Sequence, residues 1–167
     1  MRMSFARSSS SVSSPFAMST RAFIAVLAVG LCFCTGCLKF GNDTELLAPK
    51  VTAQHLQQVS SLTGIRFPNG STGLAYYYLG SGIDDALAAK IAIPADQKDA
   101  FLQNEIFQKG SKNAPNIQIG KPKAWWKIDS LTDRTDRTLQ LPQARFVECT
   151  LGVEDGKLVV YISWIST

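Results

Sequence analysis

Residues 144–165 read Ala144-Arg-Phe-Val-Glu-Cys-Thr-Leu-Gly-Val-Glu-Asp-Gly-Lys-Leu-Val-Val-Tyr-Ile-Ser-Trp-Ile165. Two runs rich in β-branched and aromatic residues, 144–154 and 157–165, flank the dipeptide Asp155-Gly156. Such a dipeptide favours a type I′ turn, because both of its residues tolerate a positive φ. The sequence therefore predicts a β-hairpin with a two-residue loop.

The register that this turn imposes gives the hairpin two different faces. One face carries only apolar or thiol side chains, and the other pairs Thr150 with Tyr161 and Glu148 with Ser163. We expect the apolar face to join the core and the other face to be half-solvated, as in a sheet covered on one side. Cys149 then acts as a small buried hydrophobic residue and not as a nucleophile. The expected apolar pairs are Val153–Leu158, Leu151–Val160, Cys149–Ile162 and Val147–Trp164.

Upstream of the hairpin, the pattern predicts two helices and further strands. Thr52 can cap a short amphipathic helix that ends at Gly64, and Pro94 precedes a second helix over about 95–108. Aromatic residues in 73–79 and the period-two pattern of 84–93 favour strands. The shorter elements that we expect are a strand at 65–67, a turn at 68–71 and a strand at 124–128.

These elements together predict an α+β fold. We expect an antiparallel sheet of about five strands with two short helices packed on one face. Residues 37–167 have the length of one domain with a single core. The folded domain is expected over 51–167, and 37–50, which lack periodicity, are expected to form a flexible tether.

A short apolar run marks the N-terminal part of the chain. Arg21 precedes the uncharged stretch 22–37, whose apolar core, 22–33, is shorter than the roughly 20 residues that a membrane-spanning helix needs. A positive charge followed by such a core and small residues is the layout of a secretory signal. The Ser-rich residues 1–17 precede Met18, and we interpret them as a dispensable or over-extended start.

The end of this run, Cys34-Thr35-Gly36-Cys37, resembles a bacterial lipobox, although Cys34 stands where an aliphatic residue is usual. The resemblance implies that 1–36 are a signal peptide and that Cys37 carries diacylglycerol. Two alternatives remain open, an ordinary signal cleaved near Gly36 and an uncleaved anchor. Without lipid on Cys37, a disulfide between Cys37 and Cys149 becomes available.

The charge of the exported part is close to neutral. The whole chain has 17 basic and 13 acidic residues, a net charge of +4. Arg2, Arg7 and Arg21 would leave with the signal, so 14 basic residues face 13 acidic ones, a net charge of +1. This balance argues against nucleic acid as a partner, since little phosphate-neutralising charge remains.

A basic and aromatic segment is the most suggestive surface feature. No acidic residue occurs from 107 to 128, where lysines surround two adjacent tryptophans. This segment could contact anionic lipid headgroups or an acidic envelope polymer. We favour the alternative of a solvated loop and a strand that buries one Trp. The candidate surface residues are Lys121, Lys123, Trp125, Trp126 and Lys127.

The sequence offers no recognisable catalytic set and no cofactor motif. His55 is the single histidine, and we interpret it as a surface residue on a short helix. One remaining thiol, Cys149, excludes a cysteine zinc site, and the acids at 129, 133 and 136 lack the spacing of a calcium loop. We therefore expect neither a metal site nor a cofactor.

Three functional hypotheses follow, and the first two belong to different classes. The leading hypothesis is a small cell-envelope lipoprotein, held by a lipid anchor on the outer side of the cytoplasmic membrane or at the outer membrane. Its domain would be a non-catalytic binding or structural module for an envelope protein or polymer. The alternative is an exported hydrolase that acts on an envelope polymer with carboxylates such as Asp84, Asp85 or Glu148. A freely exported binding protein is a third hypothesis.

Overall fold

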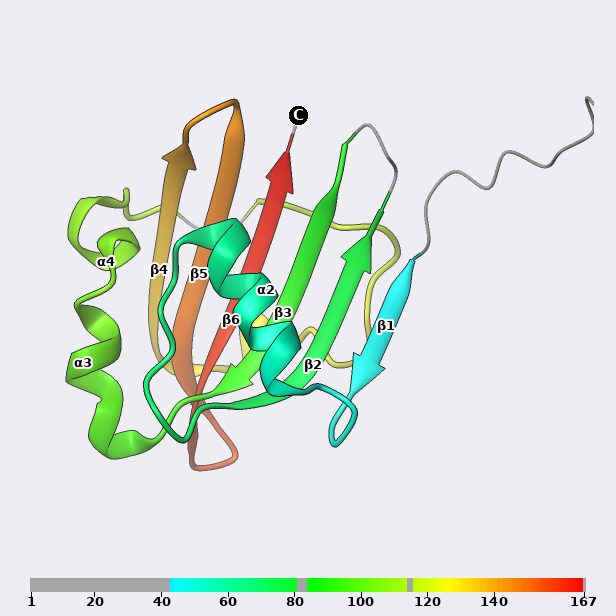
Figure 1. Cartoon of the computed structure of the whole chain (residues 1–167). Helices are drawn as coiled ribbons and strands as arrows, with labels where there is room; N and C mark the ends of the chain where they lie inside the picture. The colour runs from blue at the N-terminus through cyan, green and yellow to red at the C-terminus, as the bar shows by residue number, and fades with distance from the viewer. Residues whose placement is uncertain (1–42, 81–83, 114–115, 167) are drawn as a thin grey trace, which may run out of the picture. The chain divides into compact units, whose positions relative to one another are not determined.

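The computed structural model describes residues 43–80, 84–113 and 116–166, which form a six-stranded antiparallel sheet with short helices (Figure 1). The strand order is β1-β2-β3-β6-β5-β4. The signal region and Cys37 lie outside the described residues. The strands are β1 Thr44–Leu47, β2 Thr72–Leu79, β3 Ala86–Ala92, β4 Thr132–Leu141, β5 Arg145–Glu154 and β6 Lys157–Ser166. The helices are α2 Ala53–Thr63, α3 Lys98–Leu102 and α4 Glu105–Lys109, with 3-10 turns η1 Ala95–Gln97 and η2 Ile128–Ser130.

The hairpin of β5 and β6 forms as predicted. Asp155 and Gly156 have φ values of 50° and 73°, which a type I′ turn requires at both of its central residues. The predicted register is confirmed, since Val153 pairs with Leu158 and Val147 pairs with Trp164. β6 also pairs with β3, so the hairpin supplies the centre of the sheet.

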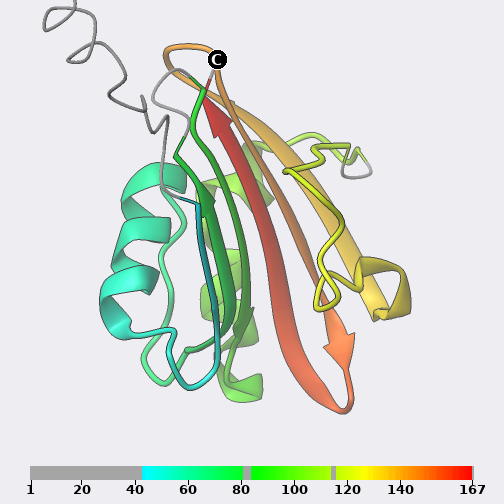
Figure 2. The same cartoon turned by 90° about the vertical axis from the view of Figure 1, so that its right-hand side faces the viewer.

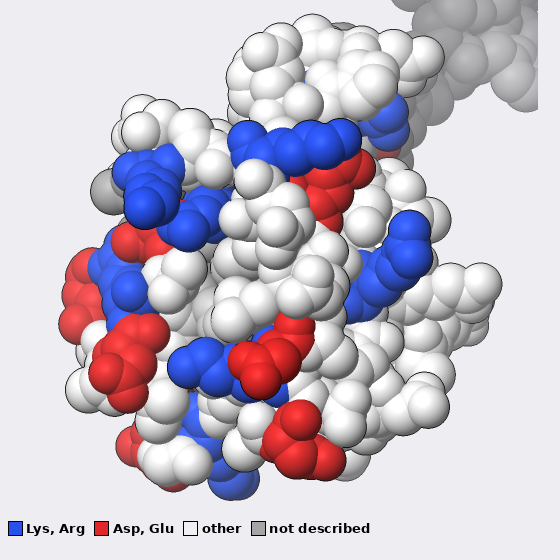
Figure 3. All heavy atoms as spheres, turned by 90° about the vertical axis from the view of Figure 1, so that its left-hand side faces the viewer, with Lys and Arg blue, Asp and Glu red and all other residues white. Residues whose placement is uncertain are grey.

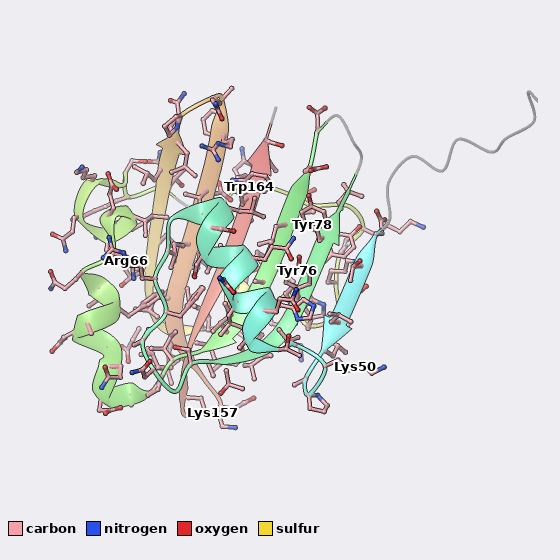
Figure 4. All side chains as sticks on the ribbon, in the orientation of Figure 1. Lys50, Arg66, Tyr76, Tyr78, Lys157 and Trp164 are labelled. Carbon is pink, nitrogen blue, oxygen red and sulfur yellow. The ribbon has the colours of Figure 1, made fainter. Side chains whose placement is uncertain are left out.

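One face of the sheet, the helix face, packs against the helices and holds the main core. Val59 of α2, Phe101 of α3 and Ile106 of α4 belong to the same buried cluster as the apolar face of the hairpin. Figure 4 places Tyr76, Tyr78 and Trp164 on the side of the sheet that α2 covers. The predicted α+β class with its helices on one face is therefore confirmed, with six strands in place of about five.

The opposite face was predicted to be half-solvated, and this prediction is wrong. Glu148, Thr150, Tyr161 and Ser163 are each 5 % exposed or less. Residues 116–131, a segment with little regular structure that we call the strap, cover Glu148, Tyr161 and Ser163, while Thr150 donates to Asp136 of β4. Figure 2 shows the strap, mostly yellow, on the side of the sheet away from α2. We call this side of the sheet the strap face.

Two strands were not predicted. Thr44–Leu47, which we had placed in the flexible tether, form β1 and pair with β2 over their whole length. The interpretation of 37–50 as a tether is therefore wrong for these four residues. Thr132–Leu141 form β4. Its many charged residues, and an irregularity at Asp133 that shifts the register of the strand, break the apolar–polar alternation by which a strand is recognised in a sequence.

Other elements differ locally from the prediction. The helix α2, the turn at 68–71 and the strands β2 and β3 are confirmed. No strand forms at 65–67, where the backbone of Arg66 hydrogen-bonds the Asn104 side chain. The expected strand at 124–128 is a turn that leads into η2.

The predicted helix at 95–108 is divided into η1, α3 and α4. Asn104 interrupts it with extended backbone angles, φ −59° and ψ 144°. Its amide nitrogen donates to the carbonyls of Phe101 and Arg66, at 2.7 Å and 3.0 Å, and its amide oxygen accepts from Arg66 N–H at 2.7 Å. These bonds compete with helix formation, because a short amide side chain can replace backbone partners.

Candidate functional site

A pocket of about 320 Å³ lies between the strap and the sheet. Ala88 of β3, Ser163 of β6 and Arg134 of β4 line it from the sheet side. Its volume is at the lower end of the range for small-molecule sites. The strap lines the pocket with residues 116–123 and with Trp126, Ile128 and Asp129.

The Glu148 carboxylate fixes one end of the strap to the sheet. Its two oxygens accept the backbone N–H groups of Asn116 at 2.7 Å and Ile117 at 2.9 Å. The Ser163 hydroxyl donates to the same carboxylate at 3.2 Å. Glu148 forms no ion pair with another described residue, so these three donors compensate its buried charge.

Glu45 of β1 holds the middle of the strap. Its carboxylate accepts from Lys123 Nζ at 2.8 Å and from Trp125 Nε1 at 3.0 Å. Hydrogen bonds from Lys123 and then Trp125 lower the pKa of Glu45 below its ordinary value. The Lys123 ammonium also lies 3.6 Å from the centre of the Tyr77 ring on β2.

An aromatic cluster packs the rest of the strap onto the sheet. Trp126 meets Trp125 and Tyr161 edge-to-face, with ring centroids 5.5 Å and 5.2 Å apart. The Tyr161 hydroxyl donates to Glu154 at 2.7 Å, and Lys90 forms an ion pair with Glu154 at 2.7 Å. Burial, followed by the bond to Glu154, raises the pKa of Tyr161.

The pocket divides the five candidate surface residues into two groups. Lys121, Lys123 and Trp126 line it, whereas Trp125 and Lys127 do not. Lys123 is engaged with Glu45, while Lys121 and Lys127 are exposed and form no ion pair with any described residue. Both tryptophans are half-buried and pack against the sheet from a loop, whereas the alternative expected a strand that buries one of them.

Several pocket residues were missed by sequence reasoning. Asn116 and Gln118 lie in the predicted loop without a distinguishing motif. Arg134 sits on the unexpected strand β4, where its Nε donates to Asp136 at 2.8 Å and its Nη1 reaches Asp129 at 3.4 Å. The i, i+2 spacing of Arg134 and Asp136 on one strand face is the signal that could have placed this pair.

Cys149 and His55, which the sequence analysis weighed as candidate catalytic residues, are both engaged in packing or capping contacts. Burial raises the pKa of the Cys149 thiol, which is 0 % exposed. His55 accepts the Thr52 N–H through Nδ1 at 3.1 Å and packs against the Tyr76 ring. The described residues include no cluster of three or more His, Cys, Asp or Glu side chains that could hold a metal ion.

A second hollow, of about 470 Å³, lies beside α3 and α4 and is lined by Arg66 (Figure 4). Acidic and basic side chains are interspersed over the surface on the α3 and α4 side of the domain (Figure 3). Within 43–80, 84–113 and 116–166, no helix has the length and apolar character that crossing a membrane requires.

Comparison with known proteins gives no match to a family model, a curated protein or a solved structure. The pocket beneath the strap is therefore characterised by its own geometry alone.

Proposed function

We propose that this chain is a small cell-envelope lipoprotein, anchored through diacylglycerol on Cys37, whose domain is a non-catalytic binding module. Its proposed localisation rests on the lipobox-like residues 34–37, which follow the short apolar run. Its binding role rests on the pocket beneath the strap.

The observation that carries the binding role is a set of polar groups in the pocket that have no partner among the described residues. Asn116, Gln118 and Lys121 are exposed residues of the lining, and their side-chain amides and ammonium make no hydrogen bond with any described residue. They stand beside the half-buried Trp126 and the buried Ile128. Polar and apolar groups share the lining about equally, and small-ligand sites likewise combine apolar walls with polar groups that fix the orientation of the ligand.

The arrangement favours binding over the two-carboxylate hydrolase. The Asp85 carboxylate accepts from Tyr78 at 2.6 Å, and Tyr78 packs on the helix face. Glu148 lies on the strap face, so the sheet separates these two acids. Two acids that flank one glycosidic bond need to be roughly 5 to 10 Å apart across an open site. A hydrolase would have to use Asp84 or another acid.

The lipid anchor and the localisation are tested by measuring the intact mass of the N-terminal peptide. The peptide is taken from membrane and soluble fractions, for the natural chain and for Cys37→Ser. We expect a diacylated Cys37 in the membrane fraction and its loss in the variant. An unmodified N-terminus in the soluble fraction would contradict the lipoprotein proposal and favour a diffusible binding protein.

The hydrolase alternative has its own test. Polymer cleavage is measured for the natural chain and for single alanine variants of Asp84, Asp85 and Glu148. The hydrolase alternative predicts that at least one of these variants loses the activity. A detected activity that is lost in one of these variants, with the fold intact, would replace the binding role by catalysis.

A further inference from the structure

We propose that the pocket beneath the strap binds a short saccharide that carries a carboxylate. This inference rests on the proposed binding role and adds the chemical class of the ligand. Three properties of the lining carry it: the amides, the apolar wall and the distribution of charge.

The amide side chains of Asn116 and Gln118 favour a ligand rich in hydroxyl or acetamido groups. Each side chain has two donors on its nitrogen and acceptor lone pairs on its oxygen. Both belong to the pocket lining, and neither is used within the described part of the chain. Sugar hydroxyl groups also donate and accept at once, so amide side chains can pair with them in either direction.

The apolar wall suits the C–H face of a sugar ring. Trp126 lines the pocket and is held between Trp125 and Tyr161 at interplanar angles of 71° and 86°. Because these contacts fix the indole, little side-chain entropy would be lost on binding. Pro122 and Ile119 continue the wall along the strap.

The charges of the lining favour one acidic group on the ligand. Lys123 is engaged with Glu45 at 2.8 Å. Arg134 is engaged with Asp136 at 2.8 Å and with Asp129, the acid of the lining, at 3.4 Å. Lys121 is the cation of the lining that has no ion-pair partner among the described residues. One uncommitted ammonium suits a single carboxylate better than a polyphosphate, whose several charges would need several cations.

Lys127 provides a matched control for Lys121. Both lysines are exposed, both belong to the basic segment, and neither has an ion-pair partner among the described residues, although the charge of Lys127 helps to lower the pKa of Glu154. Only Lys121 lines the pocket. A discrete site would therefore depend on Lys121 alone, whereas a diffuse basic surface would depend on both lysines.

The test uses the full-length chain, purified in mild detergent with whatever N-terminal processing it has received. A disaccharide that contains glucuronic acid and its neutral glucose counterpart are titrated in turn, and affinity is measured by calorimetry. We expect saturable binding of the acidic disaccharide and at least fivefold weaker binding of the neutral one. Lys121→Ala should weaken binding of the acidic disaccharide about tenfold, the loss expected for one charge-assisted hydrogen bond. Lys127→Ala should leave its affinity within about twofold, since a solvated charge outside the pocket contributes little.

Three results would overturn the inference. Equal losses in the two lysine variants would indicate a diffuse anion-binding surface, such as one for lipid headgroups. Equal affinity for both disaccharides would remove the carboxylate from the ligand class and leave the binding role standing. No saturable binding of either sugar would reject the saccharide itself. The mass of the Cys37 peptide tests the lipid anchor and the localisation independently of all three results.

Discussion

At the residue scale, Asn104 determines how the segment after β3 packs. Its side chain is 8 % exposed and makes three hydrogen bonds, two of them to the backbone of Arg66. The polar backbone of Arg66 lies 38 positions earlier in the chain and has no strand partner. The Asn104 side chain therefore gives the backbone of Arg66 the hydrogen bonds that a neighbouring strand would supply if 65–67 formed the predicted strand.

Replacing Asn104 by Ala should destabilise the domain by about 1–3 kcal/mol, because the substitution leaves polar backbone groups of Arg66 without partners. Urea denaturation of the natural chain and the variant measures this change. Gln103→Ala serves as the control, since Gln103 is exposed on the same turn. Equal midpoints for the Asn104 and Gln103 variants would show that the three bonds contribute nothing to stability.

Individual residues also show what the sequence could and could not predict. Cys149 was correctly placed in the core, because the turn at Asp155-Gly156 determines the register of its strand. Glu148 was expected on a half-solvated face, yet it is buried. The hairpin register predicted its pairing with Ser163, but its other two partners are backbone N–H groups more than 30 positions away, and side-chain patterns carry no information about those groups.

At the element scale, one ion pair connects the strap face of β3 with that of β5. Lys90 of β3 bonds Glu154 of β5 at 2.7 Å, and Tyr161 of the intervening β6 donates to the same carboxylate. Burial raises the pKa of Glu154, but hydrogen bonds from Lys90 and Tyr161, with the charge of Lys90, outweigh it. The resulting pKa lies below the ordinary value of 4.5.

This lowered pKa predicts a specific loss of stability in acid. A carboxyl group with a depressed folded pKa stabilises the fold above its unfolded pKa, and this stabilisation is lost as pH falls through the folded pKa. The free energy of unfolding should therefore decrease below about pH 4.5, and Glu154→Gln should reduce that decrease. Urea unfolding at a series of pH values between about 7 and 2.5 measures it.

The control for this series is Asp99→Asn, which removes an exposed acid from α3. Asp99→Asn should keep the acid-dependent decrease of the natural chain. If Glu154→Gln showed the same pH dependence as the natural chain, the ion pair with Lys90 would not contribute to acid sensitivity.

Whole elements were predicted where local signals agreed with tertiary packing. The hairpin, α2, β2 and β3 combine turn or cap residues with a clear period. The strands β1 and β4 lie at the two edges of the sheet, and their mixed polar sequences become strands by pairing with a neighbour. Such pairing is non-local, so neither strand has a local signal of its own.

At the scale of the whole domain, the sheet has two different covers. The helix face packs against α2, α3 and α4 through a large apolar core. The strap face is covered by an irregular segment, held mainly by the carboxylates of Glu45 and Glu148 and by a small aromatic cluster. The candidate site lies under this second cover, and for that reason the sequence revealed three of its residues, Lys121, Lys123 and Trp126, but not the pocket itself.

The central claim is that buried Glu148 holds the strap on the sheet and thereby forms the pocket. Amide hydrogen exchange of Asn116 and Ile117, compared between the natural chain and Glu148→Gln, tests this claim most directly. In the variant, one carboxylate oxygen becomes an NH₂ group, which cannot accept a backbone N–H.

We expect both amides to exchange at least about tenfold faster in Glu148→Gln, while amides of the β5–β6 hairpin keep their protection, because only the local opening of the strap becomes easier. Glu105→Gln, an exposed acid on α4, should leave all of these rates unchanged. Unchanged exchange of Asn116 and Ile117 in Glu148→Gln would contradict the claim that this carboxylate holds the strap in place.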